Sequence, residues 1–423
     1  MSETIAILGT LDTKGAELRY LRQRIAAAGA ATLVVDVGVL GAPAFEPDVT
    51  RDAVARAAGV RIADLAATHD RGHAVTHMAA GAAHVVADLF GQDKIGGVIA
   101  IGGSGNATIA CAAMQALPIG TPKLMVTTVA AGDTRPYVGT TDITMMYSVV
   151  DIAGINRFSR RILNNAANAI GAMVMGRGAD DTAPEDGHPL VGASMFGVTT
   201  PCVTAARELL EARGYEVLVF HATGVGGRSM EALIRDGFIT GVLDLTTTEL
   251  ADEVAGGTLS AGPDRLEAAG RAGIPQVVSV GALDMANFGP IESVPERFRQ
   301  RLLYRHNPAV TLMRTTAEEN ARLGALIAQK VNRARGPAAV LVPRGGVSML
   351  DVEGEPFFDP EADNALFASL RRDLHPRIDL IEVATDINDP VFAETAATTF
   401  DRLYRAWEKT REQGEPDAAT HTV

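Results

Sequence analysis

A glycine-rich turn between an apolar run and an alanine-rich segment constrains this chain most. Residues 98–101 form a short apolar run of the kind found in buried parallel strands. Residues 102–105 read Gly-Gly-Ser-Gly, and residues 108–117 favour a helix that Pro118 ends. The first N–H groups of a helix lack internal partners, so this order of elements can bind an anion. It predicts a phosphorylated ligand, most simply a nucleotide; the alternative is a tight turn that only needs positive φ.

The composition sets the class of protein. The chain has 423 residues, 47% of them hydrophobic and 21% charged, which is enough for two compact domains. The formal net charge of −13 argues against nucleic acid as a partner, because phosphate backbones require a basic face. The only two cysteines, Cys111 and Cys202, indicate no disulfide framework. The N-terminus has no signal-peptide pattern and no apolar run is long enough for a bilayer, so we expect a cytoplasmic protein without membrane contact.

The two halves of the chain repeat one pattern. In each half, an apolar run is followed by a polar segment, an amphipathic helix, a glycine and a second apolar run. Two further apolar runs follow in each half. The runs lie at 4–8, 32–35, 97–101 and 121–126 in the first half and at 190–194, 216–220, 240–245 and 274–279 in the second.

Strands that alternate with helices are expected to be parallel and joined by right-handed crossovers. Two more apolar runs, 338–342 and 380–383, extend the second half. We therefore predict an α/β fold with two doubly wound, Rossmann-like parallel-sheet domains. The N-terminal, nucleotide-binding domain would cover residues 1–180 and the C-terminal domain residues 188–423. The Asp-, Pro- and Gly-rich stretch 178–189 is the predicted linker.

Ligands of such sheets bind beyond the carboxyl ends of the strands. Polar and glycine-rich segments fall at these ends in both halves of the chain. We expect the two rims that they form to face each other across a cleft.

The segment after the first predicted strand, residues 9–15, is a second candidate for phosphate binding. Its hydroxyls on Thr10 and Thr13 can donate hydrogen bonds, and Lys14 can meet a phosphate as a point charge. Asp12 either holds a cation or caps the following helix. Asp36, at the end of the second strand, either accepts ribose hydroxyls or lies in a solvated turn.

In the second half, four residues near strand ends are candidates for catalysis. His221 follows an apolar strand and precedes a glycine-rich loop, a position that suits an acid–base role or a satisfied buried histidine. Glu249 and Asp284 are carboxylates that could act as acid and base or bind magnesium. Arg314 is a candidate anion clamp. Spacing alone does not choose among the carboxylates of this half.

Two further patterns have ordinary explanations. His69, His73 and His77 recur every four residues, so one helix would align them; a polar helix face is a better explanation than a zinc site, because no thiol or carboxylate completes the set nearby. Residues 156–175 predict a closely packed helix, either in a core or at an interface.

Taken together, the motifs resemble a known family. The chain is similar to the family of the ATP-binding N-terminal domain of the tomato mosaic virus resistance protein, which includes many uncharacterised bacterial members. The resembling stretches are 9–15, 101–106, 122–133, 137–139, 195–201, 220–227, 230–231, 243–252, 281–289, 306–315, 320 and 388–390. The resemblance implies two Rossmann-like subdomains, ATP binding and a homodimer.

One motif departs from the family pattern. The family usually reads Gly-Gly-Ser-Gly-Gly-Thr, whereas Asn106 and Ala107 stand between Gly105 and Thr108 here. Asn tolerates left-handed φ, so we expect the turn to survive with a tighter approach for phosphate.

The sequence therefore predicts an ATP-binding protein, an enzyme that acts on a small acidic metabolite with ATP and Mg²⁺. The alternative is a non-catalytic sensor of a small molecule or nucleotide. A nicotinamide-dependent oxidoreductase is weaker, because the dinucleotide fingerprint is absent. The predicted catalytic residues are His221, Glu249, Asp284 and Arg314. The predicted cofactor-binding residues are Gly9, Thr10, Asp12, Thr13, Lys14, Asp36, Gly102, Gly103, Ser104, Gly105, Asn106 and Thr108.

Overall fold

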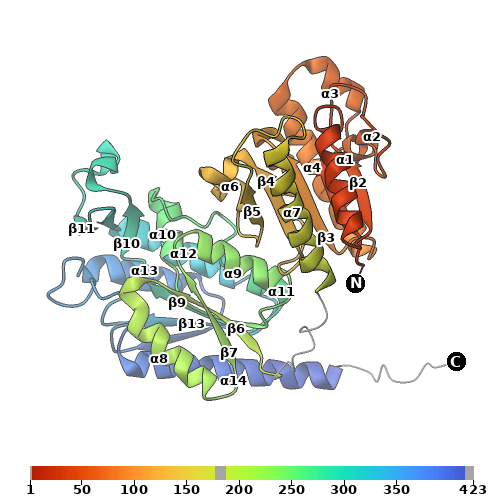
Figure 1. The fold of residues 1–423 in the computed structure, drawn as a ribbon. Helices are drawn as coiled ribbons and strands as arrows, with labels where there is room; N and C mark the ends of the chain where they lie inside the picture. Colours follow the sequence, from red (N-terminus) through yellow and green to blue (C-terminus); the bar gives the residue numbers. More distant parts are fainter. Residues whose placement is uncertain (1, 177–186, 415–423) are drawn as a thin grey trace. The chain divides into compact units, whose positions relative to one another are not determined.

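The protein consists of two compact α/β units. The computed structural model describes residues 2–176 and 187–414. The first unit comprises Met1–Pro184 and the second unit Glu185–Val423 (Figure 1). Most of the predicted linker at 178–189 lies outside the described residues.

A parallel five-stranded sheet forms the centre of the first unit. Its strand order is β2-β1-β3-β4-β5, so the chain moves outward in both directions from β1. The strands are β1 (Ile5–Gly9), β2 (Thr32–Asp36), β3 (Gly97–Gly102), β4 (Lys123–Thr127) and β5 (Thr144–Tyr147). The order reverses between β1 and β3, and this switch point is where ligands bind in open α/β sheets.

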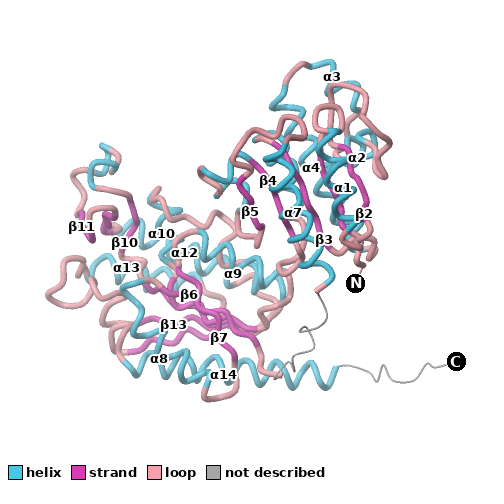
Figure 2. The backbone as a smooth tube through the Cα atoms, viewed as in Figure 1, coloured by secondary structure: helices cyan, strands magenta, loops and turns pink. Residues whose placement is uncertain are grey.

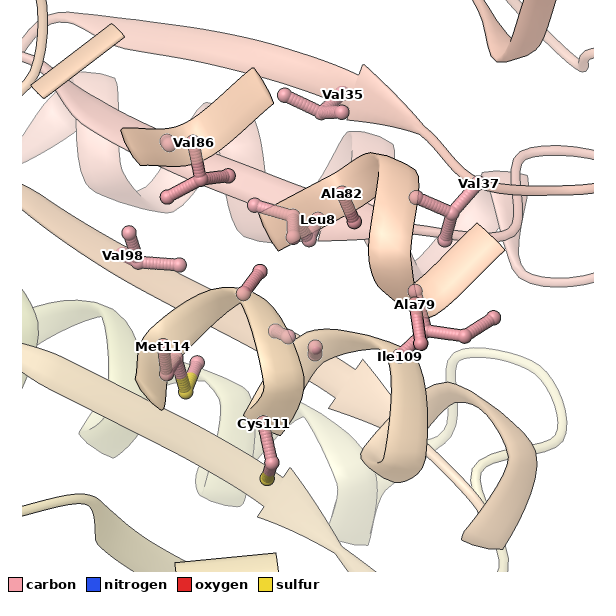
Figure 3. Close-up of a cluster of buried hydrophobic side chains, with 14 of the residues drawn as sticks. Leu8, Val35, Val37, Ala79, Ala82, Val86, Val98, Ile109, Cys111 and Met114 are labelled. Carbon is pink, nitrogen blue, oxygen red and sulfur yellow. The ribbon is translucent and has the colours of Figure 1, made fainter. Parts of the chain in front are cut away.

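Helices cover both faces of this sheet (Figure 2). They are α1 (Gly15–Ala27), α2 (Arg51–Ala57), α3 (Ile62–Thr68), α4 (Arg71–Gly91), α5 (Ser104–Gln115), α6 (Arg135–Val138) and α7 (Arg157–Met175). Alternate residues of the strands face opposite sides, as the period of two requires. In β1, Ala6 and Leu8 pack with α4 and α5 (Figure 3), whereas Ile5 and Ile7 pack with α1 and α7.

The second unit repeats this arrangement with a parallel six-stranded sheet. Its order is β14-β13-β9-β8-β6-β7, so its first strands are placed as in the first unit. The strands are β6 (Leu190–Met195), β7 (Glu216–His221), β8 (Gly241–Thr246), β9 (Gln276–Gly281), β13 (Ala338–Pro343) and β14 (Asp379–Val383). A three-stranded antiparallel sheet follows β9, with strands β10 (Met285–Phe288), β11 (Leu303–Asn307) and β12 (Val310–Arg314).

The helices of the second unit again lie on both faces of the parallel sheet. They are α8 (Thr200–Glu211), α9 (Val225–Arg235), α10 (Thr248–Ala255), α11 (Ala268–Ala272), α12 (Ala317–Val331), α13 (Pro360–Asp373) and α14 (Pro390–Gly414). One face packs with α8 and α14, through Val203, Phe392 and Phe400. The other face packs with α12 and α13, through Leu323, Ile327 and Leu366.

The predicted fold class is confirmed: both units are α/β with parallel sheets, and every predicted strand is present. Three details differ. The helix after the glycine turn starts at Ser104, four residues before the predicted 108. β5 and the antiparallel sheet were not predicted, because their strands are short and partly polar. The histidines do not share one helix, because His69 adopts a left-handed conformation (φ 52°) that ends α3.

The helix predicted at 156–175 is α7, and Asn156 and Ser159 form a capping box at its start. Its buried face packs against α1 and the central strands of the first unit, as a core helix does. No helix within the described residues is both long and apolar enough to span a bilayer.

Candidate functional site

A pocket of about 530 Å³ lies in the first unit at the switch point of its sheet. The loops that follow β1, β2 and β3 all contribute to its wall, together with the connection between α3 and α4. Its volume falls within the range of about 300–1,000 Å³ typical of sites for small ligands. The pocket brings together eight of the predicted binding residues: Thr10, Asp12, Thr13, Lys14, Gly102, Gly103, Gly105 and Asn106.

The glycine turn forms the polar end of this pocket. Gly103 is the N-cap of α5, and no side chain caps the helix or places an acidic group in its first turn. The first N–H groups of α5 therefore have no internal partner. A Cβ on Gly103 would meet nothing within 4 Å, so the backbone there is open to a ligand. Gly102 instead makes room inside the protein, because its Cβ would lie 2.7 Å from Cβ of Asn106.

Asn106 is buried in the first turn of α5 rather than exposed on the turn. Its amide Nδ2 donates to the carbonyl of Ile101 at 2.8 Å, which ties the helix start to the end of β3. Its Oδ1 is buried and has no hydrogen-bond partner among the described residues. Asn106 has negative φ, so the left-handed tolerance expected for this departure from the family pattern is not needed.

The loop after β1 brings the ammonium of Lys14 and the hydroxyls of Thr10 and Thr13 to the pocket. The Thr10 and Thr13 hydroxyls are hydrogen-bonded to each other at 2.7 Å. Lys14 is the N-cap residue of α1, and its ammonium donates to the carbonyl of Ile152. An ammonium has three N–H groups, so this bond orients Lys14 and leaves it donors for an anion.

The two predicted acidic residues of this rim are held by the protein itself. The Asp12 carboxylate does not cap α1; its Oδ2 accepts the N–H groups of Leu40 and Gly41 and lies 3.7 Å from the Arg51 guanidinium. Asp36 is fully buried and accepts the Arg51 guanidinium at 2.7 Å and the N–H of Leu11 at 3.1 Å. Its carboxylate is therefore engaged, and the solvated turn considered for it is excluded by its burial.

Three other predicted binding residues lie away from the pocket wall. Gly9 is buried at the end of β1, where a Cβ would lie 2.5 Å from the Leu18 side chain. The exposed Thr108 hydroxyl donates back to the carbonyl of Ser104 one helical turn earlier. Ser104 is the exposed first residue of α5.

Part of the pocket lining is apolar. Val37, Val39, Leu40, Leu65 and Val75 line it, and Ile109 connects it to the core between α4 and α5 (Figure 3). A pocket with one charged end and one apolar wall suits an amphipathic ligand whose anionic group is separated from a flat or aliphatic part.

Glu249, one of the predicted catalytic residues, belongs to a buried ion-pair cluster in the second unit. Its carboxylate accepts the N–H groups of Gly224 at 2.6 Å and Gly227 at 3.0 Å. It also accepts Nε of the fully buried Arg265 at 2.6 Å. Arg265 further binds Asp244, so the Glu249 carboxylate is buried among its own partners.

Asp284 and Arg314, two more predicted catalytic residues, belong to a second buried cluster. The Arg314 guanidinium binds Asp351 at 3.1 Å and Asp363 at 2.8 Å, and Asp284 accepts the Ser348 hydroxyl at 2.7 Å. Two carboxylates thus share one guanidinium, and the charge of Arg314 also acts on the nearby Asp284 without an ion pair between them. Burial raises the pKa of Asp351 well above its usual range, and the nearby Asp284 and Asp363 raise it further. Burial also raises the pKa of Asp284, although Arg314 opposes this shift.

His221 stands apart from both clusters. It is exposed at the end of β7, and its ring lies 5.4 Å from that of Phe196. The four predicted catalytic residues therefore occupy three different settings. Among the described residues, no group of three or more His, Cys, Asp or Glu side chains is arranged to hold a metal ion.

Three residues of these sites were missed by sequence reasoning. Arg51, Arg265 and Arg71 are single arginines in unremarkable contexts, and the chain contains 38 Lys and Arg residues. Only the fold shows that the first two pair with buried acids and that the third lines the pocket.

The fold and the pocket define a protein of two Rossmann-like α/β units with a polar pocket at the switch point of the first sheet. The chain belongs to the uncharacterised protein family UPF0261: the N-terminal domain of that family matches residues 3–179 and the C-terminal domain residues 188–404. This confirms the resemblance drawn from the sequence motifs.

Two related proteins that align over most of this chain support this assignment. A UPF0261 protein of Clostridium tetani is 54% identical and covers 93% of this chain and 97% of its own. The ToMV resistance protein Tm-1(GCR237) of Solanum lycopersicum is 47% identical over 73% of this chain and 42% of its own. A solved UDP-N-acetylglucosamine 2-epimerase from Rickettsia bellii aligns over 98% of this chain and 99% of its own at 11% identity, with a TM-score of 0.23.

Proposed function

We propose that the pocket of the first unit binds ATP, with the phosphates at the start of α5. The single observation that carries this proposal is the uncapped N-terminus of α5, which opens into a pocket that also contains Lys14. Unpaired N–H groups and the helix dipole favour negative charge at such a position. The family resemblance, which implies ATP, points to the same ligand.

The rest of the pocket suits the other parts of ATP. The apolar wall of Val37, Leu65 and Val75 can cover one face of an adenine. Mg²⁺ usually binds nucleotides through phosphate oxygens and only one or two carboxylates. Asp151 lines the pocket and is exposed, so it is the residue we assign to the metal.

Whether ATP is consumed depends on groups that can act on a second substrate. The sequence predicts an enzyme acting on a small acidic metabolite through the second unit. In that unit Glu249, Asp284 and Arg314 are engaged in buried ion-pair clusters, which leaves only His221 of the four predicted catalytic residues exposed. This engagement favours the alternative, a sensor that binds a nucleotide without turning it over.

Calorimetric titration with ATP and Mg²⁺ tests the proposal. We expect saturable binding by the wild-type chain and at least a hundredfold loss in Gly103→Asp, because a carboxylate there repels phosphate and blocks its approach. Gly103→Ala is the matched control: position 103 has open space and ordinary φ, so both variants should fold. ATP binding that Gly103→Asp leaves unchanged would overturn the proposal.

A phosphate-release assay on the same samples separates the two functions. Release that increases with an added acidic metabolite would identify an enzyme. Binding without release under any metabolite would identify a sensor.

A further inference from the structure

Arg71 lies at the junction of the two helices that border the pocket. It is the first residue of α4, and the preceding Asp70 caps that helix by accepting the N–H of His73 at 2.9 Å. The helices α4 and α5 share one core, in which Met78 and Val86 pack with Ala110 and Met114. Because both helices are held by this packing, the position of Arg71 relative to the start of α5 is set by the fold.

The guanidinium of Arg71 lies against the glycine turn. A Cβ on Gly105 would be 3.1 Å from Nη2 of Arg71 and 3.8 Å from its Nε. Gly105 has no positive φ, so a glycine is not required there by the backbone conformation. Its missing side chain instead gives the guanidinium room to lie beside the second residue of α5.

Arg71 is exposed to solvent, and among the described residues no hydrogen bond or ion pair joins its guanidinium to a partner. Of the acids in the pocket wall, Asp70 caps α4, Asp12 accepts two backbone N–H groups and pairs with Arg51, and the exposed Asp151 forms no ion pair with Arg71 in the part of the chain that the structure describes. The buried arginines Arg51, Arg265 and Arg314 differ, because each is paired with carboxylates.

An unpaired guanidinium beside an uncapped helix N-terminus places two positive groups side by side. Each repels the other, and an anion between them would relieve that repulsion. A guanidinium presents two parallel N–H groups that match two oxygens of one phosphoryl group. A lysine at the same position would supply the charge but not this geometry.

We infer that Arg71 is the specificity-determining residue of the pocket, where it holds a phosphoryl group bidentately against the start of α5. The inference rests on the proposed ATP site and adds what selects the ligand. The site then distinguishes phosphorylated nucleosides from neutral ones through Arg71, and Gly105 is the residue that admits the guanidinium.

Titration of the full chain with ATP and with adenosine, at low ionic strength, tests this role. We expect Arg71→Gln to weaken ATP binding about a hundredfold and Arg71→Lys about tenfold, because the lysine keeps the charge without the fork. Gly105→Ala should weaken it a few-fold by displacing the guanidinium. Adenosine should bind the wild-type chain and all variants alike, since it carries no phosphoryl group.

Arg56→Gln is the matched control, because Arg56 is an arginine of the same unit outside the pocket wall. Thermal unfolding of each variant shows whether it is folded. If the wild-type chain binds ATP and Arg71→Lys and Arg71→Gln bind it equally well, the role of Arg71 is overturned while the ATP site stands. If the wild-type chain binds no ATP, the proposed function fails first and this inference falls with it.

Discussion

The two units place a helix start at the same point of the same sheet order but treat it differently. In the first unit, β3 leads through Gly102 and Gly103 into α5, whose first turn has no acidic residue. In the second unit, β8 leads through three threonines into α10, whose first turn contains Glu249. The first junction opens into a pocket, whereas the second delivers a buried carboxylate to the rim of its own unit.

Glycines at a helix start make room for a side chain of the protein in the second unit and leave open space in the first. In the second unit, Gly224 and Gly227 at the start of α9 donate their N–H groups to Glu249. A Cβ on Gly227 would lie 2.0 Å from the Glu249 carboxylate, so the glycine admits a side chain of the protein. At Gly103 the same lack of a side chain leaves space for a ligand. The second unit therefore supplies a carboxylate of its own at this point, whereas the proposed function has the first unit take an anion from solution.

Removal of that internal anion should have the largest effect on stability. We expect Glu249→Ala to lower the free energy of unfolding of the second unit by about 3–5 kcal/mol, because it leaves Arg265 and two backbone N–H groups without the carboxylate. The fluorescence of Trp407, the single tryptophan, reports this unfolding because Trp407 lies in α14 and donates to the carbonyl of Gly273.

Added acetate tests whether the space left by Glu249→Ala binds an anion. If Glu249 fills an anion site, acetate should restore part of the stability of Glu249→Ala by occupying the space of the lost carboxylate. Chloride at equal ionic strength and the wild-type chain in acetate are the controls. If Glu249→Ala is as stable as the wild-type chain and does not respond to acetate, Glu249 does not fill an anion site in the second unit.

Asp36 offers the corresponding test in the first unit. Asp36→Asn weakens a buried ion pair with Arg51, so we expect it to lower stability by about 2 kcal/mol. Because the carboxylate is already engaged, the variant should keep the same ratio of affinities for ATP and 2′-deoxy-ATP. This ratio, measured by titration, would change if Asp36 accepted a ribose hydroxyl. Circular dichroism should show the loss of stability in a transition that Trp407 fluorescence does not follow.

The cluster around Arg314 makes the stability of the second unit depend on pH. The raised pKa values of Asp284, Asp351 and Asp363 mean that the folded state holds protons that the unfolded chain has already released. The contribution of these groups to stability is therefore fully present below the usual aspartate range and is lost as pH rises through their folded-state pKa values, by about 1.4 kcal/mol per pH unit for each such proton. Denaturant unfolding at pH 5 and pH 8 measures this slope.

Asp351→Asn is the variant that isolates this effect. An amide resembles the protonated carboxyl and does not titrate, so the variant should lose less stability than the wild-type chain between pH 5 and pH 8. Equal slopes for both chains would mean that Asp351 is ionised in the folded protein.

The sequence predicts the fold well because its signals are local. Apolar runs such as 98–101 and 338–342 are buried on both faces and need no knowledge of distant residues to be identified as parallel strands. The glycine turn is likewise local, and it does form the end of a pocket. β11 was missed because a largely exposed strand gives little periodic signal over five residues, and β12, although mostly buried, is equally short.

Whether each acidic residue is ion-paired or free could not be predicted, because the pairing depends on partners that are distant in sequence. Asp36 pairs with Arg51, Glu249 with Arg265, and Arg314 with Asp363, separated by 15, 16 and 49 residues respectively. Nothing in the neighbourhood of an aspartate shows which arginine the fold will bring to it. Position at a strand end therefore identifies a rim residue but not whether its charge is free to meet a ligand.

The smallest expected effect concerns the loop that borders the open site of the first unit. Val149 has φ 63°, a left-handed conformation that a β-branched residue rarely adopts, and its side chain is 52% exposed. The same loop brings Asp151 to the pocket and the carbonyl of Ile152 to Lys14. We expect Val149→Gly to raise the stability of the first unit by about 0.5–1 kcal/mol, since glycine adopts this φ without strain.

Val150→Gly is the matched control, because its neighbour Val150 is also exposed but has no positive φ. That variant should lose stability through the greater freedom of its unfolded chain. Val149→Gly should at the same time bind ATP a few-fold more weakly, because a relaxed loop holds Asp151 and Lys14 less firmly. Higher stability with weaker binding would show that the open site depends on a strained loop, whereas lower stability in both variants would show that the conformation of Val149 costs the fold nothing.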